Sequence, residues 1–155
     1  MMARSVLFVC LGNICRSPAG EEILRHFARD RGLDIRVESC GIGDWHAGQL
    51  PDSRMRAAAS DRGFTLSSRA KQFQPRYFDE FDLILAMDRE VLKDLYKFAK
   101  TVEHKAKVHL ATAFSTSYKD QDVPDPYYGG RADFELVLDM MEDVCEELIV
   151  KKMGS

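Results

Sequence analysis

The sequence predicts an α/β fold in which an open parallel sheet is covered by helices on both faces. Short apolar runs alternate with segments of helical periodicity along the whole chain, and this alternation is typical of parallel strands joined by right-handed crossovers. The first run, residues 6–9, is continuously apolar, as expected for a strand buried on both faces. The chain has 155 residues, a length that suits a single domain spanning 1–155.

The first strand and the first helix are predicted from local signals. After the strand at 6–9, Ser17 and Pro18 have the pattern of an N-cap followed by proline at the first helical position. The helix is expected over 18–31, with apolar residues on one face and charged residues on the other. Gly32 follows as a candidate C-cap.

The remaining elements follow from periodicity and from turn residues. The last helix is the clearest, because apolar residues recur at helical spacing from 134 to 149. The others are expected in chain order as a strand at 35–39, a loop at 41–50, a helix at 51–63, a strand at 81–86, a helix capped by Asp88 and ending near 98, a strand at 107–110, and a polar stretch at 115–131.

The loop after the first strand carries residues suited to phosphoryl transfer. Gly12 and Asn13 tolerate positive φ, so the chain can curl there and turn its backbone N–H groups toward one point. Such a cradle at a helix N-terminus attracts an anion. Arg16 adds a planar fork for two phosphate oxygens. Cys10 lies at the base of the cradle, where a thiolate would face the phosphorus atom.

Composition excludes several classes of protein. Hydrophobic residues make up 45% of the chain, charged residues make up 30%, and the net charge is −3. These values are typical of a soluble globular chain and give no reason to expect nucleic acid as a partner. The sequence has no stretch like a signal peptide and no apolar run near the ~18 residues of a membrane span. We therefore expect a cytoplasmic protein with reduced cysteines.

No metal or cofactor is predicted. The four cysteines do not form the Cys-x2-Cys spacing of a zinc site. The four histidines show no metal-ligand spacing either. They are expected at the surface or at strand ends, with contact between His46 and substrate as the less favoured alternative. These histidines are His26, His46, His104 and His109.

Two motifs resemble those of the low-molecular-weight protein tyrosine phosphatases. The first is Cys10-Leu11-Gly12-Asn13-Ile14-Cys15-Arg16-Ser17-Pro18, and the second is Asp125-Pro126-Tyr127-Tyr128. They lie near opposite ends of the chain, as in that family, so the resemblance covers essentially the whole protein. It implies a Rossmann-like open sheet of four strands in the order 2-1-3-4. It also implies a metal-independent enzyme that hydrolyses phosphotyrosine in proteins or peptides, and we expect it to act as a monomer.

The resemblance implies a role for each residue of the two motifs. Cys10 would be the nucleophile that forms phosphocysteine, Arg16 would bind the phosphoryl oxygens, and Asp125 would be the general acid. Ser17 would donate a hydrogen bond to the sulfur or only cap the helix, and Asn13 would hold the loop in shape. The residues expected to bind phosphate are Leu11, Gly12, Asn13, Ile14, Cys15, Arg16 and Ser17.

Three aromatic residues are candidates for the walls of a substrate cleft. Trp45, Tyr127 and Tyr128 could stack against the ring of an aryl phosphate. In the alternative interpretation, Trp45 packs on the core and the tyrosines cover a loop. Asp122 competes with Asp125 as the acid, since it lies three residues away. Oxidation of Cys10 is expected to end in a disulfide with Cys15.

Three other functions remain open at this point: arsenate reductase, protein-arginine phosphatase and a catalytically silent phosphate-binding module. Arsenate reductases of this fold need further cysteines as a relay, and Cys40 and Cys145 lack the close spacing for one. Protein-arginine phosphatases tend to carry threonine where Ile14 stands. The stretch 67–72, Cys40 and the pair Gly129-Gly130 depart from the family pattern, which leaves the choice of protein substrate undetermined.

Overall fold

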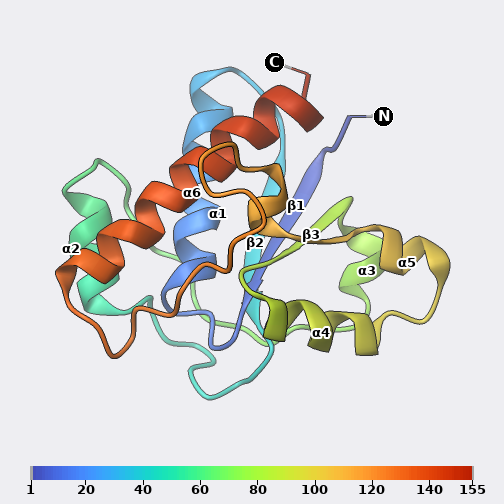
Figure 1. The fold of residues 1–155 in the computed structure, drawn as a ribbon, viewed down its shortest axis with the longest axis horizontal. Helices are drawn as coiled ribbons and strands as arrows, with labels where there is room; N and C mark the ends of the chain where they lie inside the picture. The colour runs from blue at the N-terminus through green and yellow to red at the C-terminus, as the bar shows by residue number, and fades with distance from the viewer. Residues whose placement is uncertain (1, 155) are drawn as a thin grey trace.

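The fold is built on a four-stranded parallel sheet with the strand order β2-β1-β3-β4 (Figure 1). It is seen in a computed structural model that describes residues 2–154. The predicted sheet type and strand order are confirmed. The strands are β1 (Ser5–Cys10), β2 (Arg36–Gly41), β3 (Leu83–Ala86) and β4 (Val108–Leu110).

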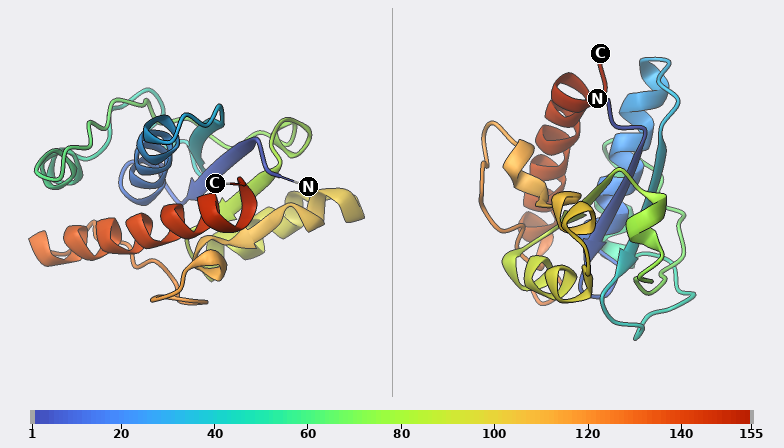
Figure 2. Two further views of the ribbon diagram at one scale, coloured as in Figure 1. Left: turned by 90° about the horizontal axis from the view of Figure 1, so that it is seen from above. Right: turned by 90° about the vertical axis from the view of Figure 1, so that its right-hand side faces the viewer.

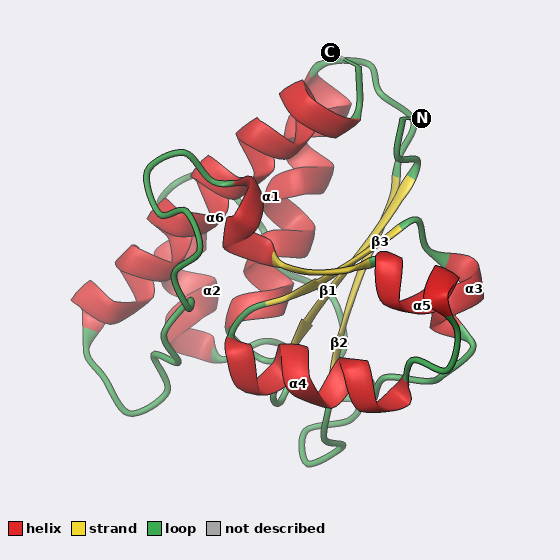
Figure 3. Cartoon of the chain, turned by 45° about the vertical axis from the view of Figure 1, so that its right-hand side comes forward, coloured by secondary structure: helices red, strands yellow, loops and turns green. Residues whose placement is uncertain are grey.

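Helices cover both faces of this sheet, as predicted. The longest ones, α1 and α6, lie side by side on one face, whereas α3 and α4 lie on the other (Figure 3). The helices are α1 (Arg16–Asp30), α2 (Ser53–Ser60), α3 (Tyr77–Glu80), α4 (Arg89–Phe98), α5 (Val102–Ala106), the 3-10 helix η1 (Ala111–Phe114) and α6 (Arg131–Lys152).

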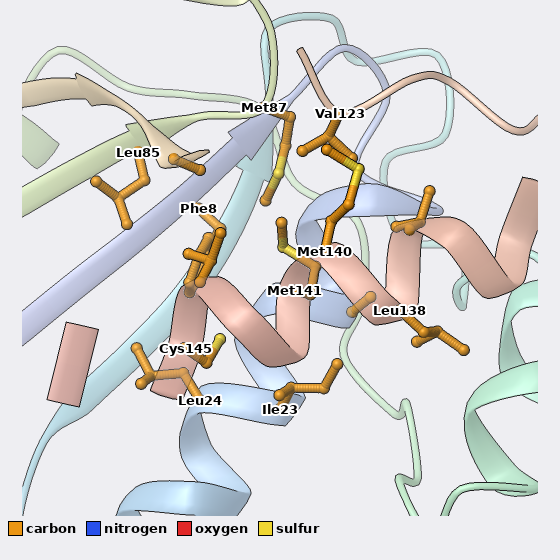
Figure 4. Packing of buried hydrophobic residues seen from close by; sticks show 14 of the residues in the cluster. Phe8, Ile23, Leu24, Leu85, Met87, Val123, Leu138, Met140, Met141 and Cys145 are labelled. Carbon is orange, nitrogen blue, oxygen red and sulfur yellow. The ribbon is translucent and has the colours of Figure 1, made fainter. Parts of the chain in front are cut away.

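The alternation of side chains along β1 creates two hydrophobic cores. Val6 and Phe8 point to the face covered by α1 and α6, while Leu7 and Val9 point to the face covered by α3 and α4. Figure 4 shows Phe8 next to the helices of the first face. All six residues of β1 are buried, because the strand is central in the sheet and has neighbours on both sides. Gly20 lets α1 approach β1 closely, since a Cβ atom there would lie 2.9 Å from the ring of Phe8.

The N-terminus of α1 differs from the prediction. The helix begins at Arg16 with Cys15 in the cap position, so Ser17 is not the N-cap and Pro18 is the third helical residue. The prediction failed because the hydroxyl of Ser17 points to a sulfur atom in the preceding loop and does not cap the helix. At the other end, Arg31 is the C-cap and Gly32 follows it with φ of 67°, which suits glycine.

The other deviations concern short elements and boundaries. The predicted strands are shifted by one or two residues, the helix at 51–63 is limited to α2, and α3, α5 and η1 were not predicted. Glu21 is buried, although it was expected on the exposed face of α1. Within residues 2–154, no helix has the length and apolar composition needed to cross a membrane.

The termini and the functional loops lie at opposite edges of the sheet. The backbone of Ala3 donates a hydrogen bond of 2.8 Å to the carbonyl of Lys152, which joins the two ends of the chain (Figure 2). The connections that follow β1 and β2 lie at the other edge, at the bottom of Figure 1. That edge carries the carboxyl ends of the strands, where open α/β sheets bind their ligands.

Candidate active site

The loop between β1 and α1 curls around the sulfur atom of Cys10. The backbone N–H of Asn13 donates to Cys10 Sγ over 3.2 Å, and Ser17 Oγ lies 2.9 Å from the same sulfur atom. Asn13 has φ of 60°, as its residue type predicts, whereas Gly12 does not adopt positive φ. Since the loop leads directly into α1, the helix N-terminus adds its positive potential near the sulfur atom. The Asn13 N–H, the Ser17 hydroxyl and the start of α1 therefore all lie beside the sulfur atom.

The side chain of Asn13 holds this loop in place. Its Nδ2 donates to Ser17 Oγ over 2.8 Å and to Ser39 Oγ over 2.9 Å, and its Oδ1 accepts from the backbone N–H of Lys71 over 3.0 Å. Ser39 in turn donates to the buried carboxylate of Glu21. The loop is therefore tied to β2, to α1 and to the segment that follows α2.

Gly41, the last residue of β2, supports the loop from behind. A Cβ atom at this position would lie 2.9 Å from the carbonyl oxygen of Leu11, 3.0 Å from the carbonyl carbon of Gly12 and 3.1 Å from the backbone nitrogen of Asn13. All three neighbours are backbone atoms, which cannot move aside without changing the loop. A residue with a side chain does not fit here.

Arg16 is buried at the first position of α1 and is held by groups from two other segments. Its Nη1 donates to Asp88 Oδ2 over 2.6 Å and to the carbonyl of Val123 over 3.0 Å, while its Nη2 lies 3.9 Å from Asp125 Oδ2. Burial opposes the positive charge, but the negative charges of Cys10 and Asp88 outweigh it and raise the pKa of Arg16. The guanidinium therefore stays charged next to the sulfur.

The two aspartates that competed as the general acid lie in different surroundings. The carboxylate of Asp125 is half exposed, accepts a hydrogen bond of 3.1 Å from the backbone N–H of Tyr127 and faces Arg16. Asp122 instead forms an ion pair of 2.7 Å with Arg89. Asp125 borders the cavity above Cys10 and Asp122 does not, so the geometry favours Asp125.

A cavity of about 250 Å³ opens above Cys10 between three connections of the chain. Trp45 is 65% exposed and borders this cavity, so the alternative in which it packs on the core is wrong. The rings of Tyr127 and Tyr128 meet edge to face, with centroids 5.0 Å apart. The lining residues are Cys10, Leu11, Gly12, Ile14, Cys15, Arg16, Trp45, His46, Asp125, Tyr127 and Tyr128.

His46 borders the cavity, although the sequence favoured a surface or strand-end position over contact with substrate. Its ring packs on the loop, because a Cβ atom at Gly12 would lie 3.1 Å from His46 Cδ2. Its Nδ1 lies 3.2 Å from Gln49 Oε1 in the same connection. Among residues 2–154, no group of three or more His, Cys, Asp or Glu side chains is arranged to hold a metal ion.

The other three cysteines lie in surroundings that oppose ionisation. Burial and the negative charge of Asp52 raise the pKa of Cys15 far above its ordinary value. Burial likewise raises the pKa of Cys40 and of Cys145. These three side chains therefore remain neutral thiols at physiological pH, and they are poor nucleophiles.

Sequence reasoning missed three residues that shape the site. Asp88 was assigned only as the N-cap of α4, which it is, but it also binds Arg16. Ser39 and Gly41 were assigned only to a strand and to the start of a loop. Gly41 and Asp88 lie at or just beyond the carboxyl end of a strand next to β1, and Ser39 lies two residues before such an end. Their position beside the central strand was the signal that could have identified them.

Comparison with known proteins gives a consistent result. Residues 5–154 match the family model for low molecular weight phosphotyrosine protein phosphatase. A low molecular weight protein-tyrosine-phosphatase of Streptomyces coelicolor is 43% identical, covering 96% of this chain and 93% of the relative. The human low molecular weight phosphotyrosine protein phosphatase is 36% identical, covering 96% and 95%.

A solved structure shows the same fold. The crystal structure of a protein tyrosine phosphatase from Entamoeba histolytica, with Hepes in its active site, matches with a TM-score of 0.91. It is 40% identical in sequence, and the match covers 95% of each chain. This chain belongs to the low molecular weight phosphotyrosine protein phosphatase family.

Proposed function

We propose that this protein is a metal-independent tyrosine phosphatase that hydrolyses phosphotyrosine and small aryl phosphates through phosphocysteine at Cys10. One observation carries the proposal. The sulfur of Cys10 receives the Asn13 N–H at a helix N-terminus, and it shares one cavity with the buried cation Arg16 and the carboxyl group of Asp125. Nucleophile, anion-binding cation and acid are the groups that phosphoryl transfer to sulfur requires.

In the first step, the thiolate of Cys10 attacks the phosphorus atom. The bond between phosphorus and the phenolic oxygen breaks, and Asp125 gives its proton to that oxygen, so that phenol leaves instead of phenolate. Arg16 and the backbone N–H groups of residues 11–17 bind the phosphoryl oxygens as negative charge develops on them. Because Asp88 fixes one side of its guanidinium, Arg16 is already oriented before substrate binds.

In the second step, water hydrolyses the phosphocysteine. The carboxylate of Asp125 takes a proton from the water molecule, the water oxygen attacks phosphorus, and the bond between phosphorus and sulfur breaks. Inorganic phosphate leaves and the thiolate is restored. Ser17, 2.9 Å from the sulfur atom, donates a hydrogen bond that stabilises the thiolate as it leaves.

The other functions considered from the sequence receive less support. A cysteine relay for arsenate reduction needs thiols that can reach the site, whereas Cys40 and Cys145 are fully buried. Ile14 places an apolar side chain on the cavity wall, which suits an aryl ring better than a guanidino group that requires polar partners. A silent phosphate-binding module would not need Asp125 beside the cavity.

The decisive experiment measures hydrolysis of p-nitrophenyl phosphate by the wild-type protein and by Cys10→Ser in the presence of a chelator. We expect the variant to lose turnover but still to bind inorganic phosphate or vanadate, since much of the cradle is backbone. The chelator should not change the rate at which the wild-type protein hydrolyses p-nitrophenyl phosphate. Activity above a few per cent in a folded Cys10→Ser variant would contradict the mechanism.

The finer parts of the proposal concern the setting in which the enzyme acts. We expect cytoplasmic phosphotyrosine proteins as substrates, because Cys10 must remain a free thiol and such thiols persist in reducing compartments. We also expect the enzyme to act as a monomer, because the three connections around the cavity come from one chain. Fractionation of cells and light scattering of the purified protein test these two points.

A further inference from the structure

The chain between η1 and α6 carries Asp125 without support from regular structure. Within the described chain, residues 115–130 form neither helix nor strand. Val123 is the last residue before Asp125 with backbone hydrogen bonds, since its N–H donates to Met87 over 2.8 Å and its carbonyl accepts from Arg16. Figure 4 shows Val123 beside Met87. Pro124 has no N–H and cannot add another bond.

Arg89 holds the segment just before Val123 at three points. Its Nη1 lies 2.7 Å from Asp122 Oδ1, its Nη2 donates to the carbonyl of Asp120 over 2.6 Å, and its backbone N–H donates to Asp122 Oδ1 over 3.1 Å. Asp120 has φ of 61°, a conformation that aspartate tolerates better than most residues. Because Arg89 is the first residue of α4, the carboxylate of Asp122 also lies at a positive helix N-terminus.

We propose that Arg89 is a positioning residue for the general acid, which clamps residues 120–122 and thereby holds Asp125 at the cavity. The proposal rests on the function proposed above. Arg89 fixes the chain just before Val123, and without it residues 120–122 would be held, within residues 2–154, only by the hydrogen bonds of Asp120 and Gln121 with Thr112 and Tyr118. Asp125 would then spend part of its time away from the phenolic oxygen that it must protonate.

Loss of the clamp should lower the activity of the enzyme without lowering its folding stability. The side chains of Arg89 and Asp122 are 59% and 47% exposed, and ion pairs at such sites contribute little to folding stability. Neither residue borders the cavity. A variant at position 89 should therefore fold normally and bind phosphate normally, and its defect should appear only where proton donation limits the rate.

The test compares Arg89→Ala with Arg76→Ala across aryl phosphates of increasing leaving-group pKa. Arg76 is a matched control, because it forms an exposed ion pair of 2.8 Å with Glu80 and does not border the cavity. For Arg89→Ala we expect kcat to fall about fivefold on poor leaving groups, a small part of the ~10²–10⁴-fold that general acid catalysis provides. The kcat on activated esters, the KM values and the Tm should stay at their wild-type values. Arg89→Lys should recover part of the loss, since it retains the charge next to Asp122.

A double-mutant cycle shows whether Arg89 acts through Asp125. In the Asp125→Ala background, adding Arg89→Ala should cause no further loss. A fivefold loss in that background, equal losses for all leaving groups, or a lowered Tm that Arg76→Ala does not share would overturn the proposal.

Amide hydrogen exchange provides a readout that does not depend on activity. In Arg89→Ala, the amides of Gln121, Asp122 and Val123 should exchange faster than in Arg76→Ala. Unchanged exchange would overturn the clamp even if activity changed. If the wild type hydrolyses no aryl phosphate, the proposed function fails, whereas the exchange experiment still decides whether Arg89 fixes this segment.

Discussion

Ser17 shows how strongly the role of a residue depends on its tertiary neighbours. The sequence predicted that Ser17 would cap the helix and favoured a hydrogen bond to the sulfur in addition. In the structure its hydroxyl does not cap the helix but lies between Cys10 Sγ and Asn13 Nδ2, at 2.9 Å and 2.8 Å. Since Asn13 Nδ2 can only donate to it, the serine hydroxyl keeps its own proton for an acceptor, and the sulfur at 2.9 Å is nearer than the carbonyl of Cys40 at 3.4 Å. Cys15 occupies the N-cap position of α1.

At the residue scale, the loss of rate caused by Asp125→Asn should depend on the basicity of the leaving group. The amide cannot give a proton to the departing oxygen, so esters of basic phenols should be hydrolysed more slowly by about 10²-fold or more. Esters of acidic phenols leave without protonation and should be hydrolysed at nearly the wild-type rate. Steady-state kinetics over a series of substituted phenyl phosphates measures this slope. A uniform loss would assign Asp125 a role other than that of the acid.

A second prediction at this scale concerns oxidation. Peroxide should convert the Cys10 thiolate to a sulfenic acid, which the thiolate of Cys15 then attacks with loss of hydroxide to form a disulfide. Both side chains border the same cavity. Because burial and Asp52 raise the pKa of Cys15, its thiolate is scarce at neutral pH, and the disulfide should form faster as the pH rises.

Mass-spectrometric mapping of peroxide-treated protein at several pH values tests this prediction. Trapping of the sulfenic acid with dimedone serves as the control, because it measures the first oxidation separately from closure of the disulfide. Cys15→Ala should lose reversible recovery by thiols. Disulfide formation that does not depend on pH, or full recovery in Cys15→Ala, would contradict the role given to Cys15.

At the scale of elements, long and strongly patterned segments were predictable from sequence. β1 was recognised from its continuous apolar run, and α6 from apolar residues at helical spacing. The short elements α3 and α5 could not be recognised, because four or five residues do not complete two helical turns. None of the five residues of α5, all of which the structure describes, is buried, so α5 has no apolar periodicity to read.

The candidate site was predictable where its residues are close in sequence. Cys10, Arg16 and their loop follow one another along the chain, so local chemistry identified them. Asp88 and Gly41 come from other elements and act through contacts with this loop. Such contacts depend on the pairing of β2 and β3 with β1, which cannot be predicted from a local sequence pattern.

A prediction at Gly41 tests whether β2 supports the loop between β1 and α1. Gly41→Ala should place a methyl group against three backbone atoms of the loop. We expect a loss of stability of about 1–3 kcal/mol from overpacking. We also expect kcat/KM to fall by about tenfold or more, since a displacement of ~1 Å at an active site can cost ~10²-fold. Thermal unfolding and kinetics with p-nitrophenyl phosphate measure both effects.

Gly130→Ala is the matched control for this substitution. A Cβ atom at Gly130 meets no atom within 4 Å, and φ is −104°, which alanine adopts without strain. Activity should stay close to wild type, whereas stability should fall slightly, because Gly130 is the N-cap of α6 and alanine is less favourable than glycine there. If Gly41→Ala behaved like the control, β2 would not be the rigid support of the loop that the geometry indicates.

At the scale of the whole molecule, the cavity exists because three distant connections meet at one edge of the sheet. The connection after β1 supplies the floor with Cys10, the connection after β2 supplies Trp45, and the chain before α6 supplies Asp125 and Tyr128. The net charge of −3 would repel an anionic substrate. Recognition of phosphate therefore depends on the local field of Arg16 and the helix N-terminus.

This arrangement should make the enzyme prefer phosphotyrosine over phosphoserine, phosphothreonine and phosphoarginine. Cys10 is only 3% exposed at the floor, whereas Trp45 and Tyr128 are 65% and 95% exposed at the rim. A short phosphoserine side chain cannot reach the sulfur without bringing peptide backbone into the cavity. A phosphotyrosine side chain reaches it, and each aromatic contact along its ring adds about 0.5–1.5 kcal/mol beyond burial.

The preference can be measured as kcat/KM on matched peptides that differ only in the phosphorylated residue. Trp45→Ala should raise KM for aryl substrates more than it lowers kcat, because the indole contacts the ring and not the reacting phosphorus. Ile14→Thr should reduce the ratio of kcat/KM for the phosphotyrosine peptide to kcat/KM for the phosphoarginine peptide, because the hydroxyl offers a hydrogen-bonding partner to the guanidino group. If phosphoserine or phosphoarginine peptides matched phosphotyrosine peptides, the aromatic walls would not select the substrate, although the chemistry at Cys10 could remain as described.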